Sequence, residues 1–269
     1  MILDGKKVSQ EIREQLRQRI LNEQLHKKLA IILVGDDPAS LRYTQKKHQK
    51  AQEIGITSFL HHLPSTSTEE EVAQVVDESN AQADGVMVQL PLPPHLNSER
   101  ILNRIAPEKD VDGLTAVSLG KLLQKDERCA PATPLGIIRL LEAYPIPFLG
   151  KEVVILSRSA LIGKPLALLF LNRGATVTVC HSQTREIKAH TLRADILVSA
   201  IGKPRLVTED MVKSGAVVVD AGTAEEAGQL VGDVDFTVVE KKASYITPVP
   251  GGVGPMTIAQ LLANVVQTP

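Results

Sequence analysis

Short, wholly apolar runs alternate with helical patterns along this chain, and that alternation constrains its fold more than any other feature. The run "LAIILVG" at 29–35 is the pattern of a strand that is buried on both faces. A helix follows, which Asp37 is expected to cap and Pro38 to open, and which continues to about Ile54. "TSFLHHL", a helix over 68–82 and "GVMVQL" extend the series. Strands that alternate with helices predict a parallel sheet.

The second half of the chain repeats this logic. "VVILSRSALIGKPLALLFLNRGATVTVC" reads as a buried strand, a Ser/Gly turn, a helix that Gly174 stops, and a second strand. "ADILVSAIG" and "GAVVVDAG" continue the alternation, and a largely helical stretch at 115–144 joins the two halves. An amphipathic first helix is indicated by apolar residues at four-residue spacing, Val8, Ile12, Leu16 and Ile20. The predicted class is α/β with parallel strands in both halves, which two domains or a single large α/β domain can accommodate.

Size, charge and cysteine content limit the partners. With 269 residues the chain is long enough for two domains. A net charge of −1 without a long basic block argues against nucleic acid or an anionic membrane surface as the main partner. The N-terminus has no signal-peptide pattern, and the longest apolar run is too short to span a bilayer. Cys129 and Cys180 make neither a disulfide framework nor a zinc site. We expect a cytoplasmic protein with reduced thiols and no metal.

The turn between the first strand and helix of the second half is a candidate phosphate site. Free backbone N–H groups and the helix dipole point at an anion in such a turn. Here the turn runs from Ser157 through Arg158 and Ser159 to Gly163, and only the last glycine of the G-x-G-x-x-G pattern is present. Taken alone, the turn is equally compatible with a plain strand-to-helix connection.

The end of the next strand favours one cofactor over another. NAD sites usually carry an acid there to hold the ribose 2′-hydroxyl, but "CHSQTR" at 180–185 has none. Ser182, Arg158 and Arg185 can instead face a 2′-phosphate. If a dinucleotide binds, NADP is therefore the better prediction.

Four polar residues of the first half form a second candidate site. Tyr43 and Lys47 lie four residues apart, and so share one face of the helix that follows the first buried strand. Gln89 ends a later strand, and Asp112 lies in the turn-like "PEKDVDGL". Each has a plain alternative: a solvated lysine face, a strand-end hydrogen bonder and a turn residue. All nonetheless fall where a parallel sheet presents its loops to ligands.

These stretches together resemble the bifunctional methylenetetrahydrofolate dehydrogenase/cyclohydrolase family over essentially the full length of the chain. The matching motifs, in order, are "ILDGK", "VGDDPAS" followed by Tyr43 and Lys47, "VQLPLP", "KDVDG", "TP" at 133–134, "RS" at 158–159, "GKP", "CHS", "VGDV" and "ITPVPGGVGPMT". Their order and spacing are distinctive, and the last motif is highly specific.

The resemblance implies a fold and two reactions. The implied fold has an N-terminal α/β catalytic, folate-binding domain over 1–122, completed by residues 250–269, and a Rossmann-like NADP-binding domain over 123–249, with the folate cleft between them. NADP-dependent oxidation of 5,10-methylenetetrahydrofolate would be followed by hydrolysis of the methenyl cation to 10-formyltetrahydrofolate. A homodimer is the usual assembly, and purine biosynthesis is the implied context.

The resemblance also implies residue roles. Lys47, neutral because burial lowers its pKa and held by Gln89, would help deliver water and accept its proton. Tyr43 would stack on the substrate, and Asp112 would accept hydrogen bonds from the pterin. Further folate contacts are implied at Leu90, Pro91, Pro250, Gly251 and Gly252, and cofactor contacts at Ser157, Arg158, Ser159, Gly163, Ser182 and Thr223.

The proline- and glycine-rich segment before the last helix has a shape role in this interpretation. It would return the chain to the catalytic domain and line the folate cleft, with glycines allowing close backbone approach and prolines fixing the path. The helix that follows would pack on the first domain through an apolar stripe of Ile258, Leu261, Leu262 and Val265.

Several positions depart from the family pattern. Ser157 replaces the usual first glycine of the phosphate turn, and Thr223 lies in a changed segment near the expected nicotinamide position. Ala132 stands where a cysteine is common, and Lys46 where a smaller or polar residue is usual. Two alternatives therefore stay open: a cyclohydrolase with weakened dehydrogenase activity, and a non-catalytic folate- or nucleotide-binding relative.

Overall fold

The chain folds into two compact units. The computed structural model describes residues 1–128, 130–226 and 228–268. One unit, here the three-stranded unit, comprises Glu11–Ala132 and Ile258–Pro269; the other, the five-stranded unit, comprises Met1–Gln10 and Thr133–Thr257. These bounds differ from the predicted division at 122 and 250, chiefly because Leu3 N–H donates to Ile246 O and joins the first residues to the five-stranded unit. The division into a folate and an NADP domain stays a prediction.

The three-stranded unit is built on a parallel sheet in the order β2-β1-β3. Its strands are β1 (Lys28–Val34), β2 (Thr57–Leu63) and β3 (Gly85–Val88). Alternate residues of β1 face opposite sides, so Leu29 and Ile31 pack with one apolar cluster and Ala30 and Ile32 with another. Every residue of β3 is buried. The predicted continuous apolar strands therefore lie between two helical layers.

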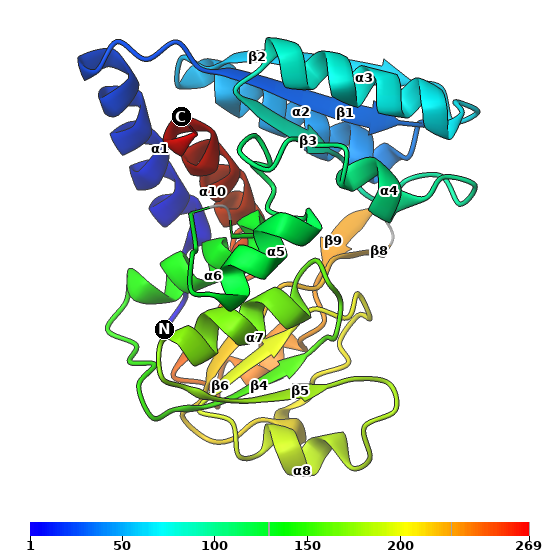
Figure 1. Ribbon diagram of the computed structural model, residues 1–269. Coiled ribbons are helices and arrows are strands. Elements are labelled where there is room, and N and C mark those ends of the chain that lie inside the picture. Colours follow the sequence, from blue (N-terminus) through cyan, green and yellow to red (C-terminus); the bar gives the residue numbers. More distant parts are fainter. Residues whose placement is uncertain (129, 227, 269) are drawn as a thin grey trace. The chain divides into compact units, whose positions relative to one another are not determined.

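Helices cover both faces of this sheet (Figure 1). On one face lie α1 (Gly5–Asn22), α2 (Pro38–Glu53) and α10 (Val253–Gln267); on the other lie α3 (Glu69–Gln82) and α4 (Ser98–Leu102). Asp37 caps α2 by accepting from Ser40 N at 2.7 Å, and Pro38 is its first residue, as predicted. Thr68 caps α3 in a reciprocal pair with Glu71.

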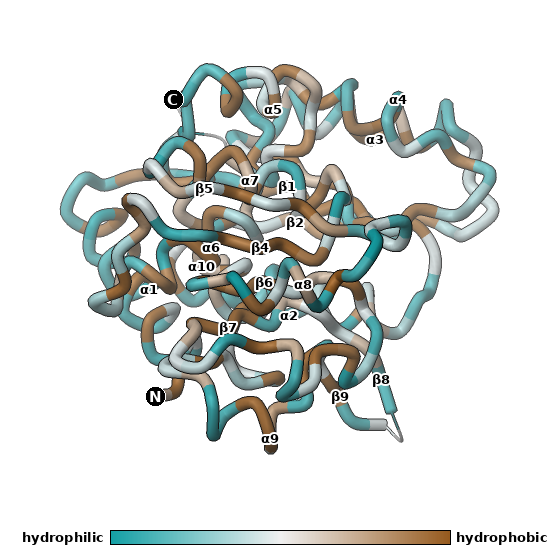
Figure 2. Tube along the Cα trace, turned by 90° about the horizontal axis from the view of Figure 1, so that it is seen from below, coloured by the Kyte–Doolittle hydropathy of each residue, from teal (hydrophilic) through white to brown (hydrophobic). Residues whose placement is uncertain are grey.

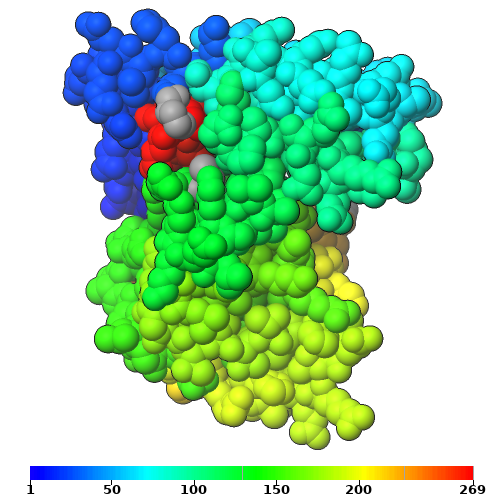
Figure 3. Space-filling model, in the orientation of Figure 1, coloured from blue at the N-terminus to red at the C-terminus, as the bar shows by residue number. Residues whose placement is uncertain are grey.

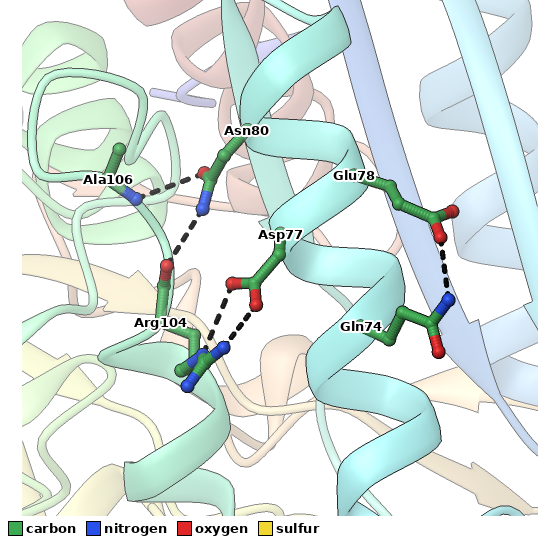
Figure 4. Close-up of polar contacts among 6 residues, drawn as sticks. All are labelled: Gln74, Asp77, Glu78, Asn80, Arg104 and Ala106. Atoms are coloured by element: carbon green, nitrogen blue, oxygen red, sulfur yellow. Dashed lines mark hydrogen bonds and ion pairs between the residues drawn. The ribbon is translucent and has the colours of Figure 1, made fainter.

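Polar contacts on α3 fix the chain that leads to the candidate site. Asn80 accepts from Ala106 N–H at 3.0 Å and donates to Arg104 O at 2.8 Å, while Asp77 forms an ion pair with Arg104 (Figure 4). In Figure 3, α3 forms part of the surface that is coloured cyan. The segment after α4 is therefore held against α3 before it reaches the "KDVDG" turn. Two further helices follow that turn, α5 (Ala116–Leu123) and α6 (Ala132–Glu142).

The five-stranded unit contains a parallel sheet in the order β10-β7-β6-β4-β5. Its strands are β4 (Glu152–Leu156), β5 (Thr176–Cys180), β6 (Ile196–Ser199), β7 (Val217–Asp220) and β10 (Tyr245–Ile246). Numbered in chain order and read from β5, this is the 2-1-3-4-5 strand order of a doubly wound nucleotide-binding fold. Strand order therefore reverses between β4 and β6, which defines a topological switch point.

Short elements connect these strands, namely α7 (Gly163–Asn172), α8 (Ile187–Thr191), the 3-10 helix η1 (Glu209–Met211) and α9 (Phe236–Val239). A hairpin of β8 (Ala224–Glu226) and β9 (Gln229–Val231) follows β7. Figure 2 shows β4 and β6 in brown and β8 in teal, so the central strands are apolar and the first strand of the hairpin is polar.

The structure confirms the predicted class, because both halves are parallel α/β sheets. The predicted strand "GVMVQL" ends early, at Val88, and the chain then passes through the polar Gln89 to Pro91, which has no N–H for a ladder. Gly174, with φ +79°, follows α7 as the predicted stop. Cys180 is a buried free thiol, whereas Cys129 lies outside the described residues. None of the described helices is long and apolar enough to cross a membrane.

Candidate active site

Lys47 is a buried lysine on the sheet-facing side of α2. Its exposed fraction is 3%. The ammonium Nζ donates to Gln89 Oε1 at 3.1 Å and lies 3.6 Å from Met87 Sδ. It also lies 4.8 Å from the centre of the Tyr43 ring, one helical turn earlier. The predicted solvated lysine face is therefore wrong for Lys47, and Tyr43, Lys47 and Gln89 are in contact.

Desolvation and charge act against each other at this site. Burial lowers the pKa of Lys47, and the nearby Asp112 carboxylate raises it in part. Burial in turn raises the pKa of Asp112, Lys47 lowers it, and the neighbouring Asp110 raises it. Both groups are thus pushed toward their neutral forms by loss of water, while their mutual attraction favours the ion pair. Such a coupled pair is suited to passing a proton.

Gln89 is oriented by its own backbone neighbourhood. Its N–H donates to Ile32 O at 2.8 Å, which anchors the residue beyond the end of β3. The side-chain Nε2 donates to Leu90 O at 2.6 Å, so Oε1 is left to face Lys47. The Leu90–Pro91 bond is cis, and Pro91 is exposed. The amide therefore presents an acceptor to the lysine and stabilises it without adding a charge.

Two aspartates in "KDVDG" have opposite environments. Asp110 is 1% exposed, and its carboxylate accepts from Gly113 N–H at 2.9 Å, Thr115 N–H at 2.8 Å and Ser118 Oγ at 2.7 Å. Asp112 is partly exposed, and none of the described residues donates a hydrogen bond to its carboxylate. Asp110 shapes the turn, whereas Asp112 keeps its oxygens available.

The last helix holds this turn from behind. Asn264 on α10 donates from Nδ2 to Val111 O at 2.8 Å, directly before Asp112. Gln260 Nε2 donates in turn to Asn264 Oδ1 at 2.6 Å. Both amides are buried. Sequence reasoning gave α10 only its apolar stripe, which is confirmed by the cluster that contains Ile258, Leu261, Leu262 and Val265. The polar pair was missed because its partners lie more than a hundred positions away.

The predicted phosphate turn of the five-stranded unit is tightly closed on itself. Ser159 Oγ accepts from Ile162 N–H at 3.1 Å and Gly163 N–H at 3.4 Å, and Ser157 Oγ donates to Ser159 Oγ at 3.2 Å. A Cβ on Gly163 would lie 2.1 Å from Ser157 O, so only glycine permits this approach of α7 to the end of β4. Arg158 is exposed beside the turn. The serines therefore use their hydroxyls within the turn, and Arg158 is its outward cation.

The ends of β4 and β5 bring the predicted 2′-phosphate residues to one edge. Leu156 and Cys180 are paired in register, so Arg158 and Ser182 both follow the carboxyl ends of adjacent strands. Both are exposed, as is Arg185. The segment between Cys180 and Arg185 is described in full and contains no acid.

The five-stranded unit contains two buried aspartates that the sequence analysis missed. Asp220 is the last residue of β7 and is 3% exposed; Asp233, in "VGDV", is fully buried. Burial raises the pKa of Asp220 to about 6, partly offset by backbone donors. Thr223 lies exposed between them in sequence. For Asp220, the sequence signal that was available is a charged residue directly after the apolar "VVV".

The segment before α10 is shaped by contacts with the start of α1. Gly251 O accepts from Lys6 N–H at 3.0 Å, and a Cβ on Gly5 would lie 1.8 Å from Gly252 O. Gly251 has φ +120°, a conformation that favours glycine, and Pro250 is exposed after a cis bond. The chain passes from one unit to the other at Thr257–Ile258, so this segment does carry the return of the chain. Across the described residues, no group of three or more His, Cys, Asp or Glu side chains is placed to hold a metal ion.

Fold and site define a two-unit α/β protein that combines a doubly wound nucleotide-binding sheet with a buried lysine–carboxylate site. Comparison with known families is specific. Residues 3–112 match the catalytic domain of tetrahydrofolate dehydrogenase/cyclohydrolase, and residues 131–269 match the NAD(P)-binding domain of the same family. The chain belongs to the tetrahydrofolate dehydrogenase/cyclohydrolase family.

Relatives cover nearly the whole chain. The bifunctional protein FolD of Bacillus pumilus is 48% identical over 99% of this chain and 96% of its own length. The crystal structure of the bifunctional FolD enzyme of Campylobacter jejuni is 44% identical, with a TM-score of 0.96 over 100% of this chain and 98% of that one. The Trypanosoma brucei FolD structure, complexed with NADP cofactor and inhibitor, is 37% identical, with a TM-score of 0.95 over 100% and 96%.

Proposed function

We propose that this chain is a bifunctional enzyme that oxidises 5,10-methylenetetrahydrofolate with NADP and hydrolyses the methenyl product to 10-formyltetrahydrofolate. The observation that carries this proposal is the buried Lys47, held by Gln89, in contact with Tyr43 and electrostatically coupled to Asp112. A buried amine without a hydrogen-bonded carboxylate is expensive to maintain. Its presence beside Gln89, just after the end of β3, in a family of folate enzymes supports a catalytic role.

Lys47 is proposed as the base of the hydrolytic step. The methenyl intermediate is a cation, so a protonated lysine beside it would be repelled, and burial favours the neutral amine. The amine would accept a proton as water adds to the methenyl carbon. Gln89 Oε1 would orient Nζ, and Tyr43 would pack on the substrate ring. Asp112, whose carboxylate has no donor among the described residues, would accept from pterin N–H groups.

The five-stranded unit fits NADP. When bound, NADP would accept the hydride from the methylene carbon. Gly163 keeps the strand-to-helix turn as tight as a dinucleotide fold requires. Arg158 and Ser182 would hold the 2′-phosphate, since an arginine supplies a charge-assisted contact and no acid stands opposite to repel it. We propose further cofactor contacts at Ser157, Ser159 and Thr223.

The folate contacts, the assembly and the biological context belong to the same proposal. Leu90, Pro91, Pro250, Gly251 and Gly252 are proposed to contact the folate through backbone and ring edges. We propose a homodimer in the cytoplasm that serves purine biosynthesis.

A spectrophotometric assay tests the function directly. Purified protein is given 5,10-methylenetetrahydrofolate with NADP or NAD, and methenyl formation is followed beside methenyl hydrolysis. We expect both reactions, with NADP preferred. Hydrolysis alone would favour the cyclohydrolase with weakened dehydrogenase activity, which the departures at Ser157 and Thr223 suggest. Absence of both reactions, with folate still bound, would favour a non-catalytic relative.

A further inference from the structure

Two buried aspartates of the five-stranded unit together connect three segments of its chain. The Asp220 carboxylate accepts from Gly222 N–H and Asp233 N–H at 3.0 Å each, and from Val234 N–H at 2.8 Å. The Asp233 carboxylate accepts from Ser199 Oγ and Ile201 N–H at 2.7 Å each, and from Lys203 N–H at 2.8 Å. The Asp220 carboxylate therefore organises backbone donors from two segments, and the Asp233 carboxylate organises donors from the end of β6 and the loop after it. We call Asp220 and Asp233 the aspartate clamp.

Glycines make the clamp possible in a reciprocal way. A Cβ on Gly222 would lie 2.1 Å from the Asp233 carboxylate, and a Cβ on Gly232 would lie 2.0 Å from Asp220 Oδ2. Each aspartate thus occupies the space left by the glycine that neighbours the other aspartate. A side chain at either glycine would displace a carboxylate from its donors.

The clamp fixes the loops at one side of the switch point. Ser199 and Asp220 end β6 and β7 and are paired in register. The clamp joins the loop after β6 (200–203) to the loop after β7 (221–223), and closes the base of the excursion that carries β8 and β9. Dinucleotides lie across the point where strand order reverses. With the 2′-phosphate at the ends of β4 and β5, the nicotinamide half falls on the side of β6 and β7.

We propose that Asp220 and Asp233 are positioning residues that set the loops for the nicotinamide half of the dinucleotide. They act through backbone, since their oxygens already accept from protein donors and are buried. This inference rests on the proposed use of NADP. It assigns no contact between either carboxylate and the cofactor.

Asp233→Asn is the main test, because an amide keeps the size of the side chain but turns one acceptor into a donor that faces an N–H or a hydroxyl. Calorimetry on the full chain compares NADP with 2′,5′-ADP, which carries the adenosine and the 2′-phosphate but no nicotinamide. We expect the dissociation constant of NADP to rise about tenfold and that of 2′,5′-ADP to stay within about twofold. Asp220→Asn should give the same split.

A matched aspartate supplies the control. Asp195 precedes β6 at the opposite edge of the sheet and accepts from Glu152 N–H at 3.0 Å and Lys213 Nζ at 2.7 Å. Asp195→Asn should lower stability without changing the ratio of the two dissociation constants. The rate of methenyl hydrolysis, which uses no nucleotide, should stay within about twofold of wild type in the clamp variants.

The outcomes separate the two levels of the proposal. If wild-type protein binds neither NADP nor 2′,5′-ADP, the proposed cofactor is wrong. If wild type binds both and Asp233→Asn weakens both by the same factor, or neither, the positioning role is wrong. Should the aspartate variants not fold, Ser199→Ala removes a single donor to Asp233. It should then shift NADP affinity alone, by about threefold, and an unchanged affinity overturns the proposal.

Discussion

Ionisable groups near the carboxyl edges of the two sheets differ in how many hydrogen bonds the protein makes to them. At the edge of the three-stranded unit, Lys47 has only neutral acceptors among the described residues, Gln89 Oε1 and Met87 Sδ, and none of those residues donates to the Asp112 carboxylate. In the five-stranded unit, Asp220 and Asp233 each accept from three protein donors. Burial perturbs groups of both kinds, so perturbation alone does not mark a catalytic residue. Unused hydrogen-bonding capacity separates the group that can act on a ligand from the group that shapes the protein.

The same contrast recurs within three residues of chain. Asp110 and Asp112 flank Val111, yet Asp110 is saturated by turn donors and Asp112 faces Lys47. We therefore expect variants of groups with unused hydrogen-bonding capacity to change catalysis or ligand binding, and variants of saturated groups to change stability. A variant of Ser157 should affect NADP and NAD alike.

The largest effect is expected for Lys47→Met. Loss of the proposed base should lower the rate of methenyl hydrolysis by about 10²–10⁴-fold. Burial depresses the pKa of Lys47, so between its folded and unfolded pKa the unfolded chain binds more protons and the lysine makes stability rise with pH. Urea unfolding of the variant should therefore show a flatter rise of stability with pH in that range. Lys46→Met, at the exposed neighbour, is the control. Wild-type hydrolysis by Lys47→Met would remove the lysine from the mechanism.

Arg158→Ala should chiefly change cofactor choice. Loss of a charge-assisted contact is worth roughly 1.5–3 kcal/mol, so kcat/KM for NADP should fall by about 10–150-fold while that for NAD changes little. Lys188→Ala removes an exposed cation elsewhere in the same unit and controls for net charge. Equal losses with the two nucleotides would place the 2′-phosphate elsewhere.

Asp112→Ala and Asp110→Ala should separate binding from stability. Asp112→Ala is expected to weaken folate binding by roughly 1.5–3 kcal/mol, with little change in the free energy of unfolding. Asp110→Ala leaves buried N–H donors without an acceptor and should lower the free energy of unfolding by about 1–3 kcal/mol or more. Folate titration and urea unfolding measure the two quantities. If both variants behave alike, the contrast between open and saturated carboxylates fails.

Asp112→Asn should move the pH dependence of hydrolysis. The wild-type carboxylate raises the pKa of Lys47, so its replacement by a neutral amide should lower that pKa further. The neutral amine then persists to lower pH, and the acid limb of kcat for methenyl hydrolysis should shift down. Measurement at saturating substrate separates this from weaker binding. If the acid limb of kcat stays at the same pH or moves to a higher pH, Asp112 does not raise the pKa of Lys47.

The smallest effect is expected for Ser157→Gly, which restores the family's usual residue in the phosphate turn. It should improve NADP and NAD by the same few-fold factor, because the pyrophosphate is common to both nucleotides. KM values for the two nucleotides measure this. A change in their ratio would show that Ser157 acts on the 2′-phosphate side.

Local patterns were enough for the framework of the fold. The predicted strand "TSFLHHL" at 57–63 coincides with β2, and Asp37 with Pro38 placed the start of α2. These features depend on neighbours in sequence, which a single chain reveals. The strand that contains Met87 was drawn too long, because Leu90 O accepts from the Gln89 side chain and Pro91 has no N–H for the ladder.

Residues of the candidate site divide by the range of their contacts. Lys47 and Tyr43 share a helical face, so their proximity followed from spacing; that Lys47 is buried did not. Asp220 and Asp233 could not be joined from sequence, because their clamp depends on two glycines that let separate segments approach. Asn264 holds Val111 from the far end of the chain, a contact that only tertiary packing creates.

Interleaving of the two units has a consequence for biosynthesis. The apolar cluster on one face of the three-stranded sheet joins Leu29 and Ile31 to Leu261 and Leu262. Residues 133–257, which come between these two parts of the cluster in the chain, build the other unit. A ribosome that has finished the three-stranded sheet therefore still carries an open hydrophobic face until α10 emerges. That interval spans translation of the entire five-stranded unit, and it is when a nascent chain is most exposed to aggregation and most in need of a chaperone.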